Sequence, residues 1–143
     1  MNRNEMKIEF GSDPRNESFA RVVVASFMTR TNPTLEEVAD VKTAVSEAVT
    51  NSIIHGYGQK EGTIEIRAYI EERKLYIEIT DYGCGIEDVE KAMEPMFTTE
   101  KDGRSGMGFS FMEAFMDELT VESEPGKGTT VKMAKKIGAG CAV

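Results

Sequence analysis

The stretch Asp81-Tyr-Gly-Cys-Gly-Ile86 places a carboxylate and two glycines directly after an alternating apolar segment. Two other stretches accompany it along the chain. Glu47 and Asn51 precede it, one helical turn apart, and Gly106-Met-Gly108 follows it. Each stretch alone says little, but in this order, within 143 residues, the three predict one site assembled from separate segments.

The composition is typical of an ordinary globular chain, with 40% hydrophobic and 29% charged residues. We expect a single domain over residues 1–136 and a disordered tail over residues 137–143. No apolar run approaches the ~20 residues that span a bilayer, and the first residues lack the core of a signal peptide. We therefore expect a cytoplasmic protein without a membrane partner.

The charge argues against direct binding to nucleic acids. The formal net charge is −8 at pH 7, and the lysines and arginines are scattered among 25 acidic residues. Proteins that grip phosphate backbones usually carry a basic patch. The single histidine and two distant cysteines also make no metal-binding spacing.

Helical periodicity predicts four helices. The first runs from about residue 14 to residue 30, with Phe19, Val23 and Phe27 on one side. A short one is expected at residues 88–93, and another after Gly108, with residues 96–105 as a loop between them. The long second helix begins with a capping box of Thr34 and Glu37 and is expected to end at Gly56. Its apolar stripe consists of Val38, Val41, Val45, Val49 and Ile53.

Alternating segments predict strands before, between and after these helices, including two hairpins. This order predicts an α+β fold: a two-layer α/β sandwich with a mixed, mostly antiparallel sheet covered on one face by helices. In the first hairpin, Ile64, Ile66, Leu75, Ile77 and Ile79 should face the core. The strands are expected over residues 6–10, 63–70, 74–80, 119–123 and 129–135.

Glu47 and Asn51 lie off the apolar stripe of the second helix, roughly opposite Val45 and Val49. A solvated helix face is the simple structural interpretation. The small residues around them favour a site instead. An amide oxygen beside a carboxylate suits a Mg²⁺–triphosphate, because Mg²⁺ takes oxygen ligands and the carboxylate can take a proton.

Asp81 can accept a hydrogen bond from an exocyclic amine such as that of adenine, and glycines let the backbone pass close to a flat ring. An ordinary strand-end turn is the alternative. The run Arg-Ser-Gly-Met-Gly at residues 104–108 predicts an anion site at a helix start, although a flexible loop explains it equally. No Walker lysine follows. Together the stretches predict a site for ATP and Mg²⁺.

These stretches resemble, in order, the N, G1 and G2 boxes of the GHKL (Bergerat) ATPase superfamily. Longer strings narrow the resemblance to the sporulation anti-sigma F factor family of serine-protein kinases, over residues 6–136. Residues 98–105 depart from that family's pattern, because they are shorter and lack a proline. The matching strings are Asn16-Glu-Ser-Phe-Ala-Arg21, Val45-Ser-Glu-Ala-Val-Thr-Asn51, Ile53-Ile-His-Gly-Tyr57, Pro95-Met-Phe-Thr-Thr99, Arg104-Ser-Gly-Met-Gly-Phe109 and Phe115-Met-Asp117.

The resemblance implies roles for individual residues. Glu47 would be the general base that activates the attacking hydroxyl, and Asn51 would coordinate Mg²⁺. Asp81 would bind the adenine amine, and residues 96–105 would form a lid over ATP or ADP. The other nucleotide contacts would come from Gly83, Gly85, Thr98, Thr99, Arg104, Ser105, Gly106, Gly108 and Thr130.

The resemblance also implies partners. The family acts as a homodimer, binds sporulation sigma factor F, and phosphorylates a serine of the anti-anti-sigma factor. Glu17 and Arg21 match positions of the docking surface, although an i,i+4 surface ion pair, worth ~0.3–0.5 kcal/mol, explains them as well. Two alternatives stay open: an anti-sigma kinase of a stress-response sigma factor, and a sigma-sequestering module without kinase activity.

Overall fold

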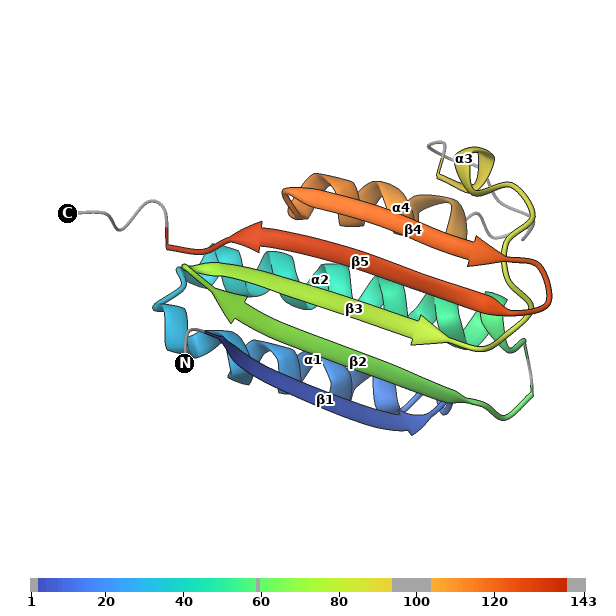
Figure 1. Ribbon diagram of the computed structural model, residues 1–143, viewed down its shortest axis with the longest axis horizontal. Helices are drawn as coiled ribbons and strands as arrows, with labels where there is room; N and C mark the ends of the chain where they lie inside the picture. The colour runs from blue at the N-terminus through green and yellow to red at the C-terminus, as the bar shows by residue number, and fades with distance from the viewer. Residues whose placement is uncertain (1–2, 59, 94–103, 139–143) are drawn as a thin grey trace.

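A computed structural model describes residues 3–58, 60–93 and 104–138, and the side chains of these residues except 104–108. The strands form one sheet in the order β1-β2-β3-β5-β4, with helices covering one face (Figure 1). All four pairings are antiparallel, which confirms the predicted α+β sandwich. The strands are β1 (Asn4–Gly11), β2 (Thr63–Glu71), β3 (Lys74–Asp81), β4 (Glu118–Glu124) and β5 (Gly128–Lys136).

The helix layer has α2 (Leu35–Asn51) at its centre, packed between α1 (Asn16–Met28) and α4 (Arg104–Phe115) (Figure 1). The capping box at the start of α2 is confirmed, since Thr34 Oγ1 accepts from Glu37 N–H at 3.0 Å and Glu37 Oε1 accepts from Thr34 N–H at 2.9 Å. The predicted stripe is also confirmed. Three of its valines are fully buried against the sheet: Val41, Val45 and Val49.

The predicted hairpin of β2 and β3 turns at Glu72 and Arg73, whose φ values of 50° and 68° suit a tight turn between twisted strands. All five core residues expected there are fully buried: Ile64, Ile66, Leu75, Ile77 and Ile79.

The buried side of α1 differs from the predicted one. Ala20, Val24 and Met28 are fully buried, whereas Phe19 is 52% exposed and packs edge-on against Phe10, with ring centroids 6.4 Å apart. The helix is also shorter than predicted, and a 3₁₀ turn, η1 (Thr29–Thr31), follows it. The side of α1 that faces the core is therefore the one that carries Ala20, Val24 and Met28.

The end of the second helix also differs from the prediction. The α-helix ends at Asn51 and continues as a π-helical turn, η2 (Ser52–Gly56), in which Tyr57 N–H donates to Ser52 O at 3.0 Å. Gly56 was expected to be the left-handed stop, but Gly58 takes that conformation, with φ of 63°. Gly56 instead permits a close contact with Asp81 at the end of β3.

Two further boundaries differ from the prediction. α4 begins at Arg104 rather than after Gly108, so residues 104 and 105 belong to a helix. The rest of the expected loop, residues 96–103, lies outside the described residues. The short helix predicted at residues 88–93 is present as α3 (Val89–Ala92), and Asp88 caps it by accepting from Lys91 N–H at 3.0 Å.

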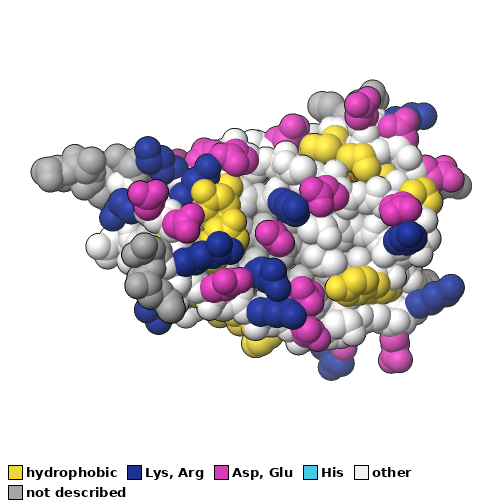
Figure 2. All heavy atoms as spheres, in the orientation of Figure 1, with side chains coloured by type: hydrophobic (Ala, Val, Ile, Leu, Met, Phe, Trp, Pro, Cys, Tyr) yellow, Lys and Arg dark blue, Asp and Glu magenta, His cyan; other side chains and the backbone are white. Residues whose placement is uncertain are grey.

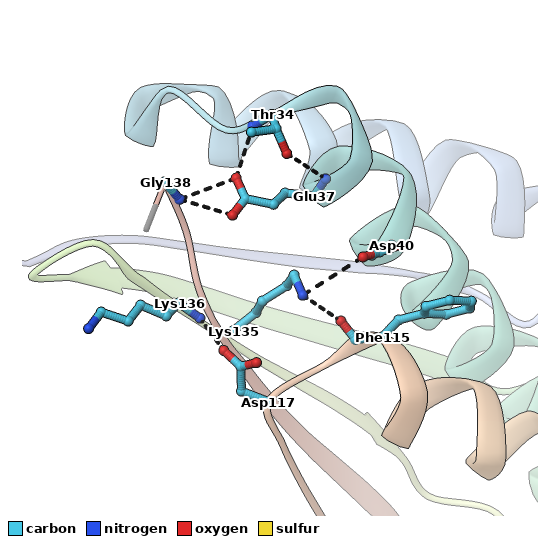
Figure 3. A network of polar contacts seen from close by, with 8 residues as sticks. All are labelled: Thr34, Glu37, Asp40, Phe115, Asp117, Lys135, Lys136 and Gly138. Atoms are coloured by element: carbon cyan, nitrogen blue, oxygen red, sulfur yellow. Dashed lines mark hydrogen bonds and ion pairs between the residues drawn. The ribbon is translucent and has the colours of Figure 1, made fainter. Parts of the chain in front are cut away.

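The end of β5 is anchored to the helix layer, as Figure 3 shows. Gly138 N–H donates to both carboxylate oxygens of Glu37, at 3.2 and 3.1 Å. Lys135 Nζ donates to Phe115 O at 2.8 Å and lies 3.8 Å from the Asp40 carboxylate. The last strand therefore holds both α2 and α4.

The predicted disordered tail is wrong at its first two positions. Ile137 is fully buried in the core, and its N–H donates to Arg73 O at 2.9 Å. Gly138 makes the contacts with Glu37 just described. The remaining tail residues, 139–143, lie outside the described residues.

The second face of the sheet is polar, and Figure 2 shows acidic and basic side chains interspersed over it. Ion pairs cross the strands, with Lys7 Nζ 3.5 Å from Glu65 and Lys132 Nζ 3.2 Å from Glu122. None of the helices in residues 3–58, 60–93 and 104–138 is both long and apolar enough to cross a membrane.

Candidate functional site

A cavity of about 480 Å³ opens where the end of α2, the end of β3 and the start of α4 meet. Its volume lies within the ~300–1,000 Å³ that small-molecule sites occupy. Polar groups from α2 and β3 lie among apolar side chains from the other elements. The lining consists of Ala48, Asn51, Ser52, His55, Gly56, Asp81, Cys84, Gly85, Ile86, Glu87, Asp88, Lys91, Ala92, Phe109, Thr129 and Val131.

Asp81 is the buried acid of this cavity, with only 4% of its surface exposed. Burial raises the pKa of its carboxyl above the ordinary value, against hydrogen bonds that lower it from Gly83 N–H, the Ser52 side chain and the Thr129 backbone. The Gly83 N–H lies 3.0 Å from Oδ1. Asp81 also lines the cavity, so its carboxyl oxygens can accept a hydrogen bond from a ligand.

Glycines let the π-helical turn and the segment after β3 touch. A Cβ built on Gly83 would lie 2.0 Å from Gly56 O, and one built on Gly56 would lie 2.9 Å from Asp81 Cγ. Gly85 has φ of 77°, and its Cβ would lie 2.2 Å from Glu124 O. These glycines therefore shape the cavity by permitting close backbone contacts.

Backbone and hydroxyl groups fix the segment after β3 in place. Cys84 N–H donates to Gly56 O at 2.8 Å. Tyr57 Oη accepts from Tyr82 N–H at 2.8 Å and donates to Thr63 O at 2.5 Å. The predicted glycine-rich stretch is thus held by the end of the second helix.

The structure brings together several residues predicted from sequence. Asn51, Asp81 and Gly85 line the cavity, and Gly83 N–H donates a hydrogen bond to the Asp81 carboxylate. Glu47 is half-buried on α2, one turn before Asn51, and is not among the described lining residues.

The predicted phosphate-binding segment lies beside the cavity. Arg104, Ser105, Gly106 and Gly108 belong to the first turns of α4, and the next residue, Phe109, lines the cavity. Thr98 and Thr99 lie outside the described residues.

Thr130 does not line the cavity. Its hydroxyl lies 3.1 Å from that of Thr80, on the open face of the sheet. The neighbouring Thr129 points to the helix side, is 9% exposed and lines the cavity. The described lining of the cavity therefore contains Thr129 and not the predicted Thr130, because successive strand residues point to opposite faces.

Glu17 and Arg21 are separate from this site. They form an ion pair of 3.5 Å on α1, and no residue of that helix is among the cavity's described lining. Val22 beside them is 55% exposed, and Phe19 is similarly exposed. This part of α1 thus combines charges with exposed apolar side chains.

Sequence reasoning missed several lining residues, among them Ser52, His55, Cys84 and Thr129. Ser52 directly follows Asn51, the residue predicted to coordinate Mg²⁺. This neighbouring position could have indicated that Ser52 lies near the site. The carbonyl oxygen of His55 lies 3.0 Å from Cys84 Sγ. Thr129 pairs with Asp81 across β3 and β5, a register that the sequence does not reveal.

The cavity suits a flat base that carries an exocyclic amine. The Asp81 carboxylate offers an acceptor at one end, and Ile86, Phe109 and Val131 offer apolar contact. Asn51 adds an amide oxygen, which a hard cation accepts as a ligand.

Comparisons with known proteins agree with this geometry. The family model of the histidine kinase-like ATPase domain matches residues 10–135. An anti-sigma F factor of Thermoanaerobacter sp. (strain X514) is 60% identical over 137 residues, covering 95% of this chain and 96% of the relative. One of Clostridium acetobutylicum is 59% identical over 138 residues, covering 96% of each chain.

A solved structure shows the same fold. The catalytic domain of histidine kinase ThkA matches with a TM-score of 0.58 and 16% identity, covering 92% of this chain and 96% of that one. At this identity the likeness concerns the fold alone. The sequence relatives and the matching domain together show that the chain belongs to the anti-sigma F factor family and carries a histidine kinase-like ATPase domain.

Proposed function

We propose that this protein binds ATP in the cavity, sequesters sigma factor F, and phosphorylates a serine of the anti-anti-sigma factor. The observation that carries the proposal is the buried Asp81 carboxylate in a cavity that Asn51 also lines, in a chain closely related to anti-sigma F factors. The sigma factor and the serine substrate come from the family assignment.

In this proposal the cavity holds adenine. Asp81 accepts a hydrogen bond from the exocyclic amine, while Gly83 and Gly85 keep the backbone close to the ring. Thr129, rather than Thr130, supports the carboxylate through its backbone N–H. The apolar lining residues cover the faces of the base.

The phosphates would lie between the end of α2 and the start of α4. Asn51 coordinates Mg²⁺ together with phosphate oxygens, since Mg²⁺ needs few protein ligands when a triphosphate supplies others. The helix start at residues 104–108 offers backbone N–H groups to anions, and Thr98 and Thr99 belong to the same proposed phosphate region. ATP supplies the phosphoryl group, and Mg²⁺ spreads its charge.

Glu47 takes the proton of the substrate serine. It is half-buried on the same helix as Asn51, one turn earlier, so a hydroxyl group beside the phosphates would lie near both. A carboxylate in this place acts as a general base and orients the attacking oxygen.

Sigma factor F docks on α1 in this proposal. Glu17 and Arg21 supply charges, and the exposed Phe19 and Val22 supply apolar contact. Charged pairs beside exposed apolar side chains are typical of a protein interface. The protein acts as a homodimer, in line with its family, which light scattering of the purified protein tests.

The proposal is tested with purified protein, sigma factor F, the anti-anti-sigma factor and labelled ATP with Mg²⁺. We expect label on a serine of the anti-anti-sigma factor. We also expect sigma factor to be held in the complex until unphosphorylated anti-anti-sigma factor is added. Sigma binding without transfer would support a sequestering module, and failure to bind sigma factor F would contradict the proposal.

A further inference from the structure

Lys91 is the one lysine or arginine among the described residues that line the cavity. The acidic side chains of the same lining are those of Asp81, Glu87 and Asp88, so its described charges are mostly negative. A nucleotide adds the negative charge of its phosphates, and placing these beside carboxylates costs free energy unless a cation compensates. Lys91 is therefore the described lining residue best suited to the phosphates of a nucleotide.

The spacing of residues on α3 directs Lys91 to the cavity. Asp88, Lys91 and Ala92 all line it, and positions i, i+3 and i+4 lie on one face of a helix. The Asp88 carboxylate accepts a hydrogen bond from Lys91 N–H at 3.0 Å and so caps the start of α3. That carboxylate is thus engaged by the helix backbone, whereas the Lys91 ammonium lies at the end of a flexible four-carbon stem.

Contacts on both sides of α3 fix its place relative to Asp81. Before the helix, Ile86 N–H donates to Ser123 Oγ of β4 at 2.7 Å. At the end of the helix, Ala92 packs against the hydrophobic core. The backbone of Lys91 is therefore held in a defined position, from which its side chain reaches the same cavity as the Asp81 carboxyl.

From this arrangement we propose that Lys91 binds the phosphate chain of the nucleotide, with its ammonium group donating to phosphate oxygens while Asp81 binds the base. The inference rests on the proposed binding of a nucleotide in this cavity. The two opposite charges also orient the nucleotide. The carboxylate accepts from the amine of the base and repels phosphates, whereas the ammonium attracts phosphates.

The test compares ADP with adenosine, which has the same base and sugar but no phosphate. Calorimetric titration follows ADP with Mg²⁺, and NMR titration follows the weaker binding of adenosine. Both are applied to wild-type protein, Lys91→Met, Lys91→Arg and Lys60→Met. Methionine keeps a long unbranched side chain without the charge, and arginine keeps the charge. Lys60 is the matched control, because it is exposed and is not among the described lining residues.

We expect Lys91→Met to bind ADP about tenfold more weakly, the size of one hydrogen bond to a charged group. Its binding of adenosine should change less than about twofold. Lys91→Arg should keep most of the affinity for ADP, and Lys60→Met should leave both ligands unaffected. The loss in Lys91→Met should shrink as salt rises from about 0.05 M to about 0.5 M, because salt screens an exposed charge.

Equal losses for ADP and adenosine in Lys91→Met would overturn the inference, because the side chain would then shape the cavity rather than bind phosphate. Unchanged binding of ADP would overturn it too, while the nucleotide site stands. Lys91 is exposed, so its variants should fold, which a thermal melt verifies. If wild-type protein binds neither ligand, the nucleotide site itself is wrong, and the inference fails with it.

Discussion

Gly83 and Gly56 are in direct backbone contact, so that a Cβ on Gly83 would lie 2.0 Å from Gly56 O. This contact joins the end of β3 to the π-helical turn after α2, and Cys84 N–H completes it by donating to the same carbonyl oxygen at 2.8 Å. The two segments that supply Asp81 and Asn51 are therefore fixed relative to each other by a pair of glycines.

Gly83→Ala should open this contact. The methyl group meets backbone atoms rather than a flexible side chain, so the two segments must separate, at a cost of about 2 kcal/mol or more in unfolding free energy. Urea denaturation and ATP titration measure both effects. Gly11→Ala is the control, because its Cβ would meet only Gly62 O at 4.0 Å. Equal behaviour of the two variants would show that the contact does not shape the cavity.

Asp81→Asn should weaken ATP binding by about 10- to 100-fold, because it removes a charged acceptor. It should not destabilise the fold at neutral pH. Burial raises the pKa of the Asp81 carboxyl in the folded protein, so the folded state binds the proton more tightly than the unfolded state. The contribution of this group to the unfolding free energy therefore falls as pH rises from about 4 through the folded pKa.

Urea denaturation of wild-type protein and Asp81→Asn at several pH values checks the sign. The unfolding free energy of the variant minus that of the wild type should increase across this range and level off above it. A difference that decreases with pH would mean that the pKa is lowered, and that the carboxylate stabilises the fold.

Tyr57→Phe should loosen the segment after β3. The variant keeps the ring but removes the hydroxyl that accepts from Tyr82 N–H and donates to Thr63 O. We expect a loss of about 1–3 kcal/mol in unfolding free energy, and faster hydrogen exchange at the Tyr82 amide. Tyr82→Phe removes the same atom from a side chain that is 61% exposed, and should be neutral. Equal exchange rates in wild type and Tyr57→Phe would argue against this role.

Ile137→Ala should destabilise the protein by about 3 kcal/mol, since it leaves a cavity in the core. Thermal or urea unfolding measures it. Ile54→Ala, at a residue 43% exposed, is the control and should cost much less. If Ile137→Ala is as mild as the control, the first residue after β5 does not belong to the core.

Local patterns predicted the elements whose partners lie nearby in sequence. The Thr34–Glu37 capping box and the stripe that includes Val45 follow from helix geometry alone, and both are confirmed. The β2–β3 hairpin is equally local. The motif around Asp81 was recognised only together with Glu47, Asn51 and Gly106-Met-Gly108, because an ordinary strand-end turn explains it equally well when it stands alone.

The features that sequence patterns did not predict correctly depend on tertiary contacts between segments far apart in the chain. Gly56 looked like a helix stop, but in the structure it is in close contact with Gly83, which follows β3. Thr130 was the residue predicted from the family resemblance, whereas Thr129 lines the cavity, because a shift of one residue in a strand changes the face on which a side chain lies. Ile137 belongs to no periodic pattern, so its burial depends on where β5 ends.

Glu47 gives the most direct test of the account, because the proposed kinase activity depends on its carboxylate. The measurement is single-turnover transfer from labelled ATP to the anti-anti-sigma factor, with wild-type protein, Glu47→Gln, and Glu36→Gln as a control at the exposed start of the same helix. Binding of ATP and of sigma factor F is measured in parallel. We predict transfer slower by about 100- to 10,000-fold in Glu47→Gln, with both binding affinities retained and Glu36→Gln unaffected. Transfer at the wild-type rate in Glu47→Gln would contradict the account.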